Sequence, residues 1–232
     1  MNIFITPPDK HFDGGLGSSA SNFKSASESL KNSEENSSVD LPICYLQRHS
    51  IELYLKSLIY ILHKKFDISF GDDFTLKNPA ILINGKWKPL SNTHNLSDLY
   101  NYFLTVFESE KVSMPSTTDW SIDPKIKTKI DLISGYDPKS TYFRYPTSLD
   151  VKRDAIKSDI QPMDLEDAIS QMNSSNGKPV KCAVMLDAND NVIETYDLAA
   201  DTLNNVKQSL DETIEFMHNI QAAFLGELTK WT

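Results

Sequence analysis

Three polar side chains share one face of the longest apolar segment of the sequence. Arg48, Glu52 and Lys56 follow one another at intervals of four residues, and His49 lies one position to the side. In an α-helix, residues four apart lie one above another, so Glu52 can pair with both cations. One interpretation is a surface salt-bridge ladder, with roughly 0.3–0.5 kcal/mol per pair. The other is the floor of a functional site.

Two later segments also carry residues that can do chemistry. His94 precedes an apolar-patterned segment, at the expected N-terminus of a helix, where backbone N–H groups favour anions. Arg144 and Tyr145 belong to the sequence YFRYP, which we expect to be extended, with its aromatic side chains packed inward and its arginine aimed at a specific group. The alternatives are a capping or surface histidine at position 94 and an arginine stacked on neighbouring rings at position 144.

These residue types could cleave RNA without a metal ion or a cofactor. Attack by a 2'-hydroxyl on the adjacent phosphate needs a base of near-neutral pKa and a cation beside the charge that develops on the phosphoryl oxygens. A glutamate in such a site would orient the base rather than react. The candidate catalytic residues are His94, His49 and Arg48, and the candidate substrate- or phosphate-binding residues are Lys56, Glu52, Arg144 and Tyr145.

Composition limits the classes of function. The 232-residue chain is 40% hydrophobic and carries a net charge of -9, so no broad basic surface can hold nucleic acid, and RNA binding would need a local patch. Cys44 and Cys182 lack the spacing of metal ligands, which is typical of reduced cysteines in a cytosolic protein. We see neither a signal peptide nor an uninterrupted apolar segment of bilayer length, and therefore expect a cytoplasmic protein.

A central helix over Asp40–Phe66 must position the polar face. Asp40 is a good N-cap, Pro42 suits the first turn, and the apolar residues cover most of the circumference, which indicates burial on several sides. Apolar spacing predicts a preceding helix over 17–31 that forms an antiparallel hairpin with it.

Further helices are expected after His94, capped by Thr93 or Asn95, and over 123–135, ended by Gly135. A weak short helix could cover 165–172, and a long closing helix is predicted from about 198 to 231.

Turn sequences mark two β-hairpins between these helices. Asn84-Gly85 is the strongest short hairpin signal, and Asn189-Asp190-Asn191 separates two runs of β-forming residues. We therefore expect a mainly α fold. Residues 1–15 would be a flexible N-terminal arm, and residues 16–232 a single helical domain with insertions at about 67–91 and 147–197.

The segments RHSIELYLKSLI, THNLSDL and YFRYP, in this order, together resemble the HEPN domains of prokaryotes. The resemblance rests on a helix with a Glu-x-x-x-Lys stripe followed by a helix that starts at His-x-Leu, and it covers roughly residues 16–146 and the last helix. It implies an up-and-down helical bundle, here with the two hairpins inserted.

HEPN domains commonly form dimers, and many are metal-independent endoribonucleases of toxin–antitoxin, phage-defence or CRISPR-linked systems, whereas others bind or scaffold without catalysis. The active members usually carry an Arg followed four to six residues later by a His. Here His49 follows Arg48 at once, and the usual spacing is absent. The resemblance therefore implies either a homodimeric endoribonuclease or a non-catalytic module that binds RNA, a nucleotide or a partner protein, with no membrane association.

Overall fold

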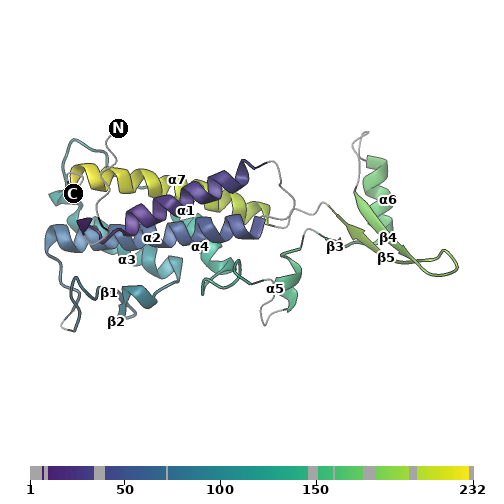
Figure 1. The fold of residues 1–232 in the computed structure, drawn as a ribbon, viewed down its shortest axis with the longest axis horizontal. Coiled ribbons are helices and arrows are strands. Elements are labelled where there is room, and N and C mark those ends of the chain that lie inside the picture. The colour runs from purple at the N-terminus through teal and green to yellow at the C-terminus, as the bar shows by residue number, and fades with distance from the viewer. Residues whose placement is uncertain are drawn as a thin grey trace. The chain divides into compact units, whose positions relative to one another are not determined.

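A computed structural model describes residues 7, 10–33, 40–71, 73–145, 151–158, 160–174, 181–198 and 203–229. The chain divides into two compact units, Met1–Arg144 with Val206–Thr232 and Tyr145–Asn205. Most described residues are helical and the strands form two small sheets, which confirms the expected mainly α fold class (Figure 1).

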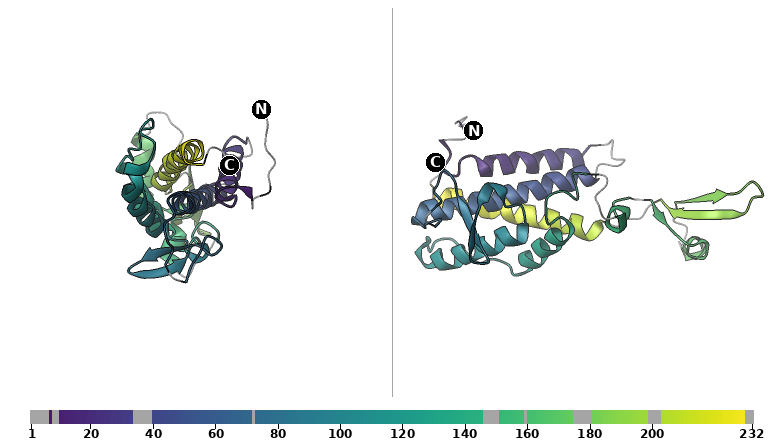
Figure 2. Two further views of the ribbon diagram at one scale, coloured as in Figure 1. Left: turned by 90° about the vertical axis from the view of Figure 1, so that its left-hand side faces the viewer. Right: turned by 90° about the horizontal axis from the view of Figure 1, so that it is seen from below.

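The first unit is a bundle built around the predicted central helix. That helix, α2, has the predicted bounds and contacts both α1 and α3, while α7 runs alongside α2 (Figures 1 and 2). An ion pair between Lys24 of α1 and Glu215 of α7, at 2.8 Å, links these two helices. Its side chains are buried on nearly every side, as the apolar pattern indicates. The helices of this unit are α1 (Leu16–Lys31), α2 (Asp40–Phe66), α3 (Leu96–Glu110), α4 (Lys125–Tyr136) and α7 (Asn204–Glu227), with short 3-10 turns at Leu90–Asn92 and Lys111–Ser113.

A buried carboxylate fixes the start of α1. Asp13 is 3% exposed, accepts hydrogen bonds from the backbone N–H of Gly15 at 3.0 Å and of Gly17 at 2.7 Å, and also accepts one from the hydroxyl of Ser57 on α2. Gln221 of α7 donates to the same hydroxyl at 2.8 Å. Residues 10–15 thus pack on the bundle through Asp13, where we expected a flexible arm, because the carboxylate satisfies the first N–H groups of α1.

Gly17 is expected to tolerate no side chain. A Cβ there would lie 2.8 Å from Asp13 Oδ2 and closer still to Gln221 Nε2. Gly17→Ala should therefore lower the free energy of unfolding by about 1–3 kcal/mol, although Gly→Ala in a helix ordinarily stabilises by up to about 1 kcal/mol. Gly135→Ala in α4 is the matched control, because its Cβ would meet nothing within 4 Å. Urea unfolding of both variants measures the difference, and equal stabilisation by the two would contradict the Asp13 network.

The first predicted hairpin is confirmed. Strands β1 (Ala80–Ile83) and β2 (Lys86–Pro89) pair antiparallel, with Ile83 opposite Lys86. Asn84 and Gly85 have φ of 51° and 75°, the left-handed conformations that this two-residue turn requires.

The segment around Arg144 differs from the extended conformation that we expected. Residues 142–144 form a turn in which the N–H of Arg144 donates to the carbonyl of Thr141 at 3.2 Å. The side chain of Asp137 imposes this turn by accepting from the N–H groups of Thr141 at 2.6 Å and Tyr142 at 3.0 Å. The expected inward packing is confirmed for Tyr142 and Phe143, which are 5% and 4% exposed.

The second unit contains the other predicted hairpin, in the region where we expected the insertion at 147–197. Its sheet has the strand order β3-β5-β4, with both pairs antiparallel. The elements are α5 (Val151–Ala155), β3 (Gln161–Pro162), α6 (Leu165–Ser174), β4 (Cys182–Leu186) and β5 (Val192–Asp197).

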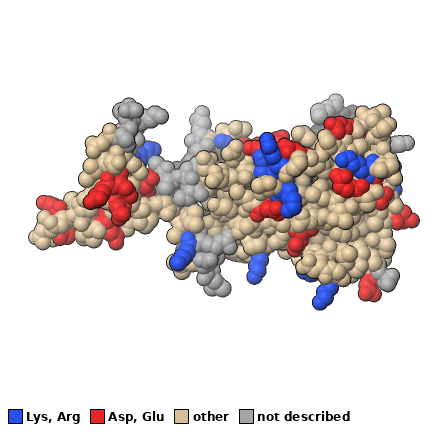
Figure 3. Space-filling view, turned by 180° about the vertical axis from the view of Figure 1, so that it is seen from behind, with Lys and Arg blue, Asp and Glu red and all other residues tan. Residues whose placement is uncertain are grey.

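Charges of both signs lie on the face of the molecule in Figure 3. On the face in Figure 3, acidic and basic side chains are interspersed and no broad basic area appears. Cys44 and Cys182 are both free thiols. None of the helices in the described part of the chain has the length and apolarity needed to cross a membrane.

Candidate functional site

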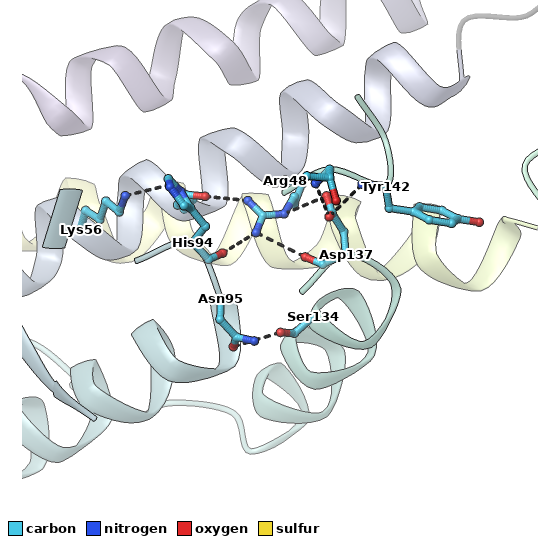
Figure 4. A network of polar contacts seen from close by, with 9 residues as sticks. Arg48, Lys56, His94, Asn95, Ser134, Asp137 and Tyr142 are labelled. Atoms are coloured by element: carbon cyan, nitrogen blue, oxygen red, sulfur yellow. Dashed lines mark hydrogen bonds and ion pairs between the residues drawn. The ribbon is translucent and has the colours of Figure 1, made fainter. Parts of the chain in front are cut away.

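Arg48 lies inside the bundle, where α2 faces the start of α3 and the end of α4 (Figure 4). Its Nη1 donates to Glu52 Oε2 at 2.6 Å, and its Nη2 donates to the carbonyl oxygen of His94 and, at 3.4 Å, to that of Asp137. Its Nε forms an ion pair with Asp137 Oδ2 at 3.2 Å. The side chain is 0% exposed, so this guanidinium joins three elements from within the core.

Glu52 links Arg48 to the other predicted site residues. Its Oε1 accepts from Lys56 Nζ at 2.8 Å and lies 2.9 Å from His94 Nδ1. Burial alone would raise the pKa of Glu52, but Lys56 and Arg48 beside it hold that pKa below its ordinary value. Glu52 and Lys56 are 2% and 6% exposed. The interpretation as a surface salt-bridge ladder is therefore wrong in one respect, because the pairs exist but are buried.

His94 is the part of this network that reaches solvent. Its side chain is 48% exposed while its Nδ1 is held by Glu52. When the neutral imidazole donates from Nδ1 to the carboxylate, Nε2 carries the lone pair that can accept a proton. Of the two caps that we expected for the following helix, Asn95 is the one observed, since its side chain accepts from the N–H of Asp98 at 3.0 Å, and Ser134 of α4 donates to the same oxygen at 3.2 Å.

Asp137 is the member of the network that sequence analysis missed. It is 0% exposed and follows the end of α4, where it holds both Arg48 and the turn at 141–142. The sequence Asp-Pro-x-Ser-Thr did carry a signal, because an Asp before such residues often accepts backbone N–H groups in a turn. Nothing in the spacing identified Arg48 as its partner.

His49 and Arg144 both contact the ring of Tyr45. The His49 ring stacks on Tyr45 at 5.8 Å between ring centroids and meets Phe23 edge-on at 4.6 Å. Arg144 lies over the ring of Tyr45, 5.8 Å from its centroid, which agrees with the expected alternative of an arginine stacked on a ring. Burial lowers the pKa of His49, which favours its neutral form.

Tyr145 belongs to the second unit and is 49% exposed. Its carbonyl oxygen accepts from Lys157 Nζ at 2.9 Å. The structure therefore brings together Arg48, Glu52, Lys56 and His94 as expected, and places His49 and Arg144 at Tyr45.

The charges of the network are balanced. The guanidinium of Arg48 and the ammonium of Lys56 face the carboxylates of Glu52 and Asp137. A site that binds a phosphoryl group needs an excess of positive charge directed at the ligand. Here each cation points at a carboxylate, and the half-exposed imidazole of His94 is the group best placed to meet a ligand. Comparison with known proteins found no match for the chain among family models, characterised proteins or solved structures.

Proposed function

We propose that the chain is a HEPN-like helical module of a bacterial toxin–antitoxin or phage-defence system that binds a partner and does not cut RNA. The mainly helical fold and the order of the three resembling segments support this proposal. In it, the module acts in the cytoplasm as a homodimer and holds a partner protein of the same system.

The observation that carries the proposal is the burial of Arg48. A metal-free ribonuclease must present a cation to the phosphoryl oxygens as charge develops on them. Arg48 has no exposed surface and points at Glu52, Asp137 and two carbonyl oxygens. Freeing it would expose buried carboxylates and break the contacts of α2 with Asp137 and with the carbonyl oxygen of His94. Its role in this proposal is therefore to hold these three parts of the bundle together.

One observation favours a second candidate, a metal-independent endoribonuclease. Glu52 Oε1 lies 2.9 Å from His94 Nδ1, and a carboxylate in this position orients an imidazole for proton transfer. His94 Nε2 would take the proton of a 2'-hydroxyl. The freed oxygen would attack the adjacent phosphorus, and the 5'-oxygen of the next nucleotide would leave with a proton from water, giving a 2',3'-cyclic phosphate and a 5'-hydroxyl. Lys56 shares Glu52 Oε1 with His94, so its ammonium group is already paired with that carboxylate.

A metal-free cleavage assay separates the two candidates. Purified full-length chain is incubated with an end-labelled single-stranded RNA in excess EDTA, beside the His94→Ala variant and a buffer control. We expect no product above the buffer control from either protein, and a stoichiometric complex when the chain is co-expressed with the products of its flanking genes. Cleavage that His94→Ala abolishes would replace the first candidate by the second. Cleavage that is unchanged in His94→Ala would contradict both.

A further inference from the structure

The two edges of the sheet in the second unit differ in how they are protected. Strand β3 is two residues long and contains Pro162, which cannot donate to a neighbouring strand. Strand β4 pairs with β5 on one side and, among the described residues, with no strand on the other. Its sequence CAVML contains neither a charge nor a proline. An edge of this kind favours pairing with a further strand.

The hydrogen bonds to β5 show which residues of β4 face the open edge. The N–H of Leu198 donates to the carbonyl of Lys181 at 3.0 Å, and the N–H of Asp187 donates to the carbonyl of Asn191 at 2.9 Å. Because the hydrogen-bonding direction alternates along an antiparallel strand, the odd-numbered residues of β4 bond to β5. Cys182, Val184 and Leu186 therefore direct their N–H and C=O groups outward.

The residues that flank β4 make it complementary to itself. Lys181 precedes the strand and Asp187 follows it, with only apolar residues between them. In an antiparallel pair of two β4 strands centred on Val184, Lys181 of each copy lies opposite Asp187 of the other. The same register places Cys182 opposite Leu186, so outward-facing residues meet outward-facing residues. Opposite charges directly across two strands stabilise their pairing.

The side chains along this strand also favour a covered surface. Val184, Met185 and Leu186 are 43%, 52% and 52% exposed. These three consecutive apolar residues lie on an edge strand, and pairing with a further strand would bury part of each.

We propose that β4 is a self-association edge, at which a second copy of this chain adds its own β4 in antiparallel register about Val184. The two three-stranded sheets then form one continuous six-stranded sheet with a Lys181–Asp187 pair at each end of the junction. This inference assigns a surface to the homodimer of the proposed function, but it is argued from the second unit alone. A failure of the association therefore leaves the partner-binding and RNA-cleavage tests of the proposed function unaffected.

Sedimentation velocity of the full chain, over about 1–100 µM, tests the association. We expect the mass to rise with concentration from 26.2 kDa toward twice that value. Lys181→Glu should raise the dissociation constant at least about tenfold, because it places like charges opposite one another. Lys152→Glu makes the same charge change at another exposed lysine of this unit and should leave association unchanged.

A cysteine cross-link tests the register. Leu186→Cys would stand opposite the native Cys182 of the second copy, and Cα atoms about 5.5 Å apart across a hydrogen-bonded pair permit a disulfide. Oxidation should convert this variant to a covalent dimer. Ile193→Cys, an equally exposed position on the inner strand β5, should remain monomeric on a denaturing gel. A wild-type chain that is monomeric throughout, or equal cross-linking of both variants, would overturn the proposal.

Discussion

Replacing Arg48 by Met is expected to lower the free energy of unfolding of the first unit by about 3–5 kcal/mol. Met preserves much of the side-chain volume, so packing changes little. The loss arises because Glu52 and Asp137 remain buried without the cation that lies 2.6 Å and 3.2 Å from them. Two carbonyl oxygens also lose their donor.

Urea unfolding followed by tryptophan fluorescence measures this effect, since Trp87 and Trp120 belong to the first unit and the sequence of the second unit, residues 145–205, contains no tryptophan. Lys127→Met is the matched control, because it removes the cation of an exposed i,i+4 pair with Asp131 and should cost less than about 0.5 kcal/mol. Equal losses for the two variants would show that the Arg48 network contributes no more than a surface ion pair.

Replacing Phe224 by Ala is expected to have a similar effect, with a loss of about 3–5 kcal/mol. Phe224 is 0% exposed on α7, and its ring lies 6.3 Å, 6.2 Å and 5.7 Å from those of Phe103, Phe107 and Trp120. The substitution removes a ring that joins α7 to α3 and leaves a cavity that these neighbours fill only in part.

The same unfolding experiment measures it, with Phe216→Ala as the control. Phe216 lies two turns earlier on α7 and is only partly buried, so its loss should cost about half as much. A Phe224→Ala variant as stable as Phe216→Ala would mean that α7 is not packed on the aromatic cluster of α3.

The central helix could be predicted with its bounds, because local signals agree there. Asp40, Pro42 and an apolar pattern around the whole circumference all indicate one long buried helix. Asn84-Gly85 determined the first hairpin in the same way, through a turn that few other residues can adopt. In both cases the information lies within a few residues of the element that it determines.

The candidate site could be predicted only in part. The order of the segments permits His94 to reach Glu52, and the structure forms that contact at 2.9 Å. The depth of Arg48 could not be predicted, since it depends on Asp137, which is 89 residues away in the sequence. Contacts at such separations follow from the packing of whole helices, and residue spacing carries no signal for them.

The predicted extended conformation around Arg144 was wrong for a related reason. The proline after Tyr145 favours an extended backbone, but Asp137 binds two N–H groups of the segment and bends it into a turn. These hydrogen bonds to Asp137 outweigh the local preference for an extended backbone. In this conformation Arg144 lies over the ring of Tyr45.

The rate at which the Nε–H proton of Arg48 exchanges with water tests most directly whether this side chain is buried and paired with Asp137. The chain contains only three arginines, Arg48, Arg144 and Arg153, so a proton–nitrogen NMR spectrum of their Nε–H groups is simple, and Arg48→Met identifies the signal. With Nε buried 3.2 Å from Asp137 Oδ2, we predict that the Arg48 signal persists at pH 8 and exchanges at least about tenfold more slowly than that of the exposed Arg144. An Arg48 signal that exchanges as fast as that of Arg144 would contradict the account, because the guanidinium would then be open to solvent and free to meet a phosphate.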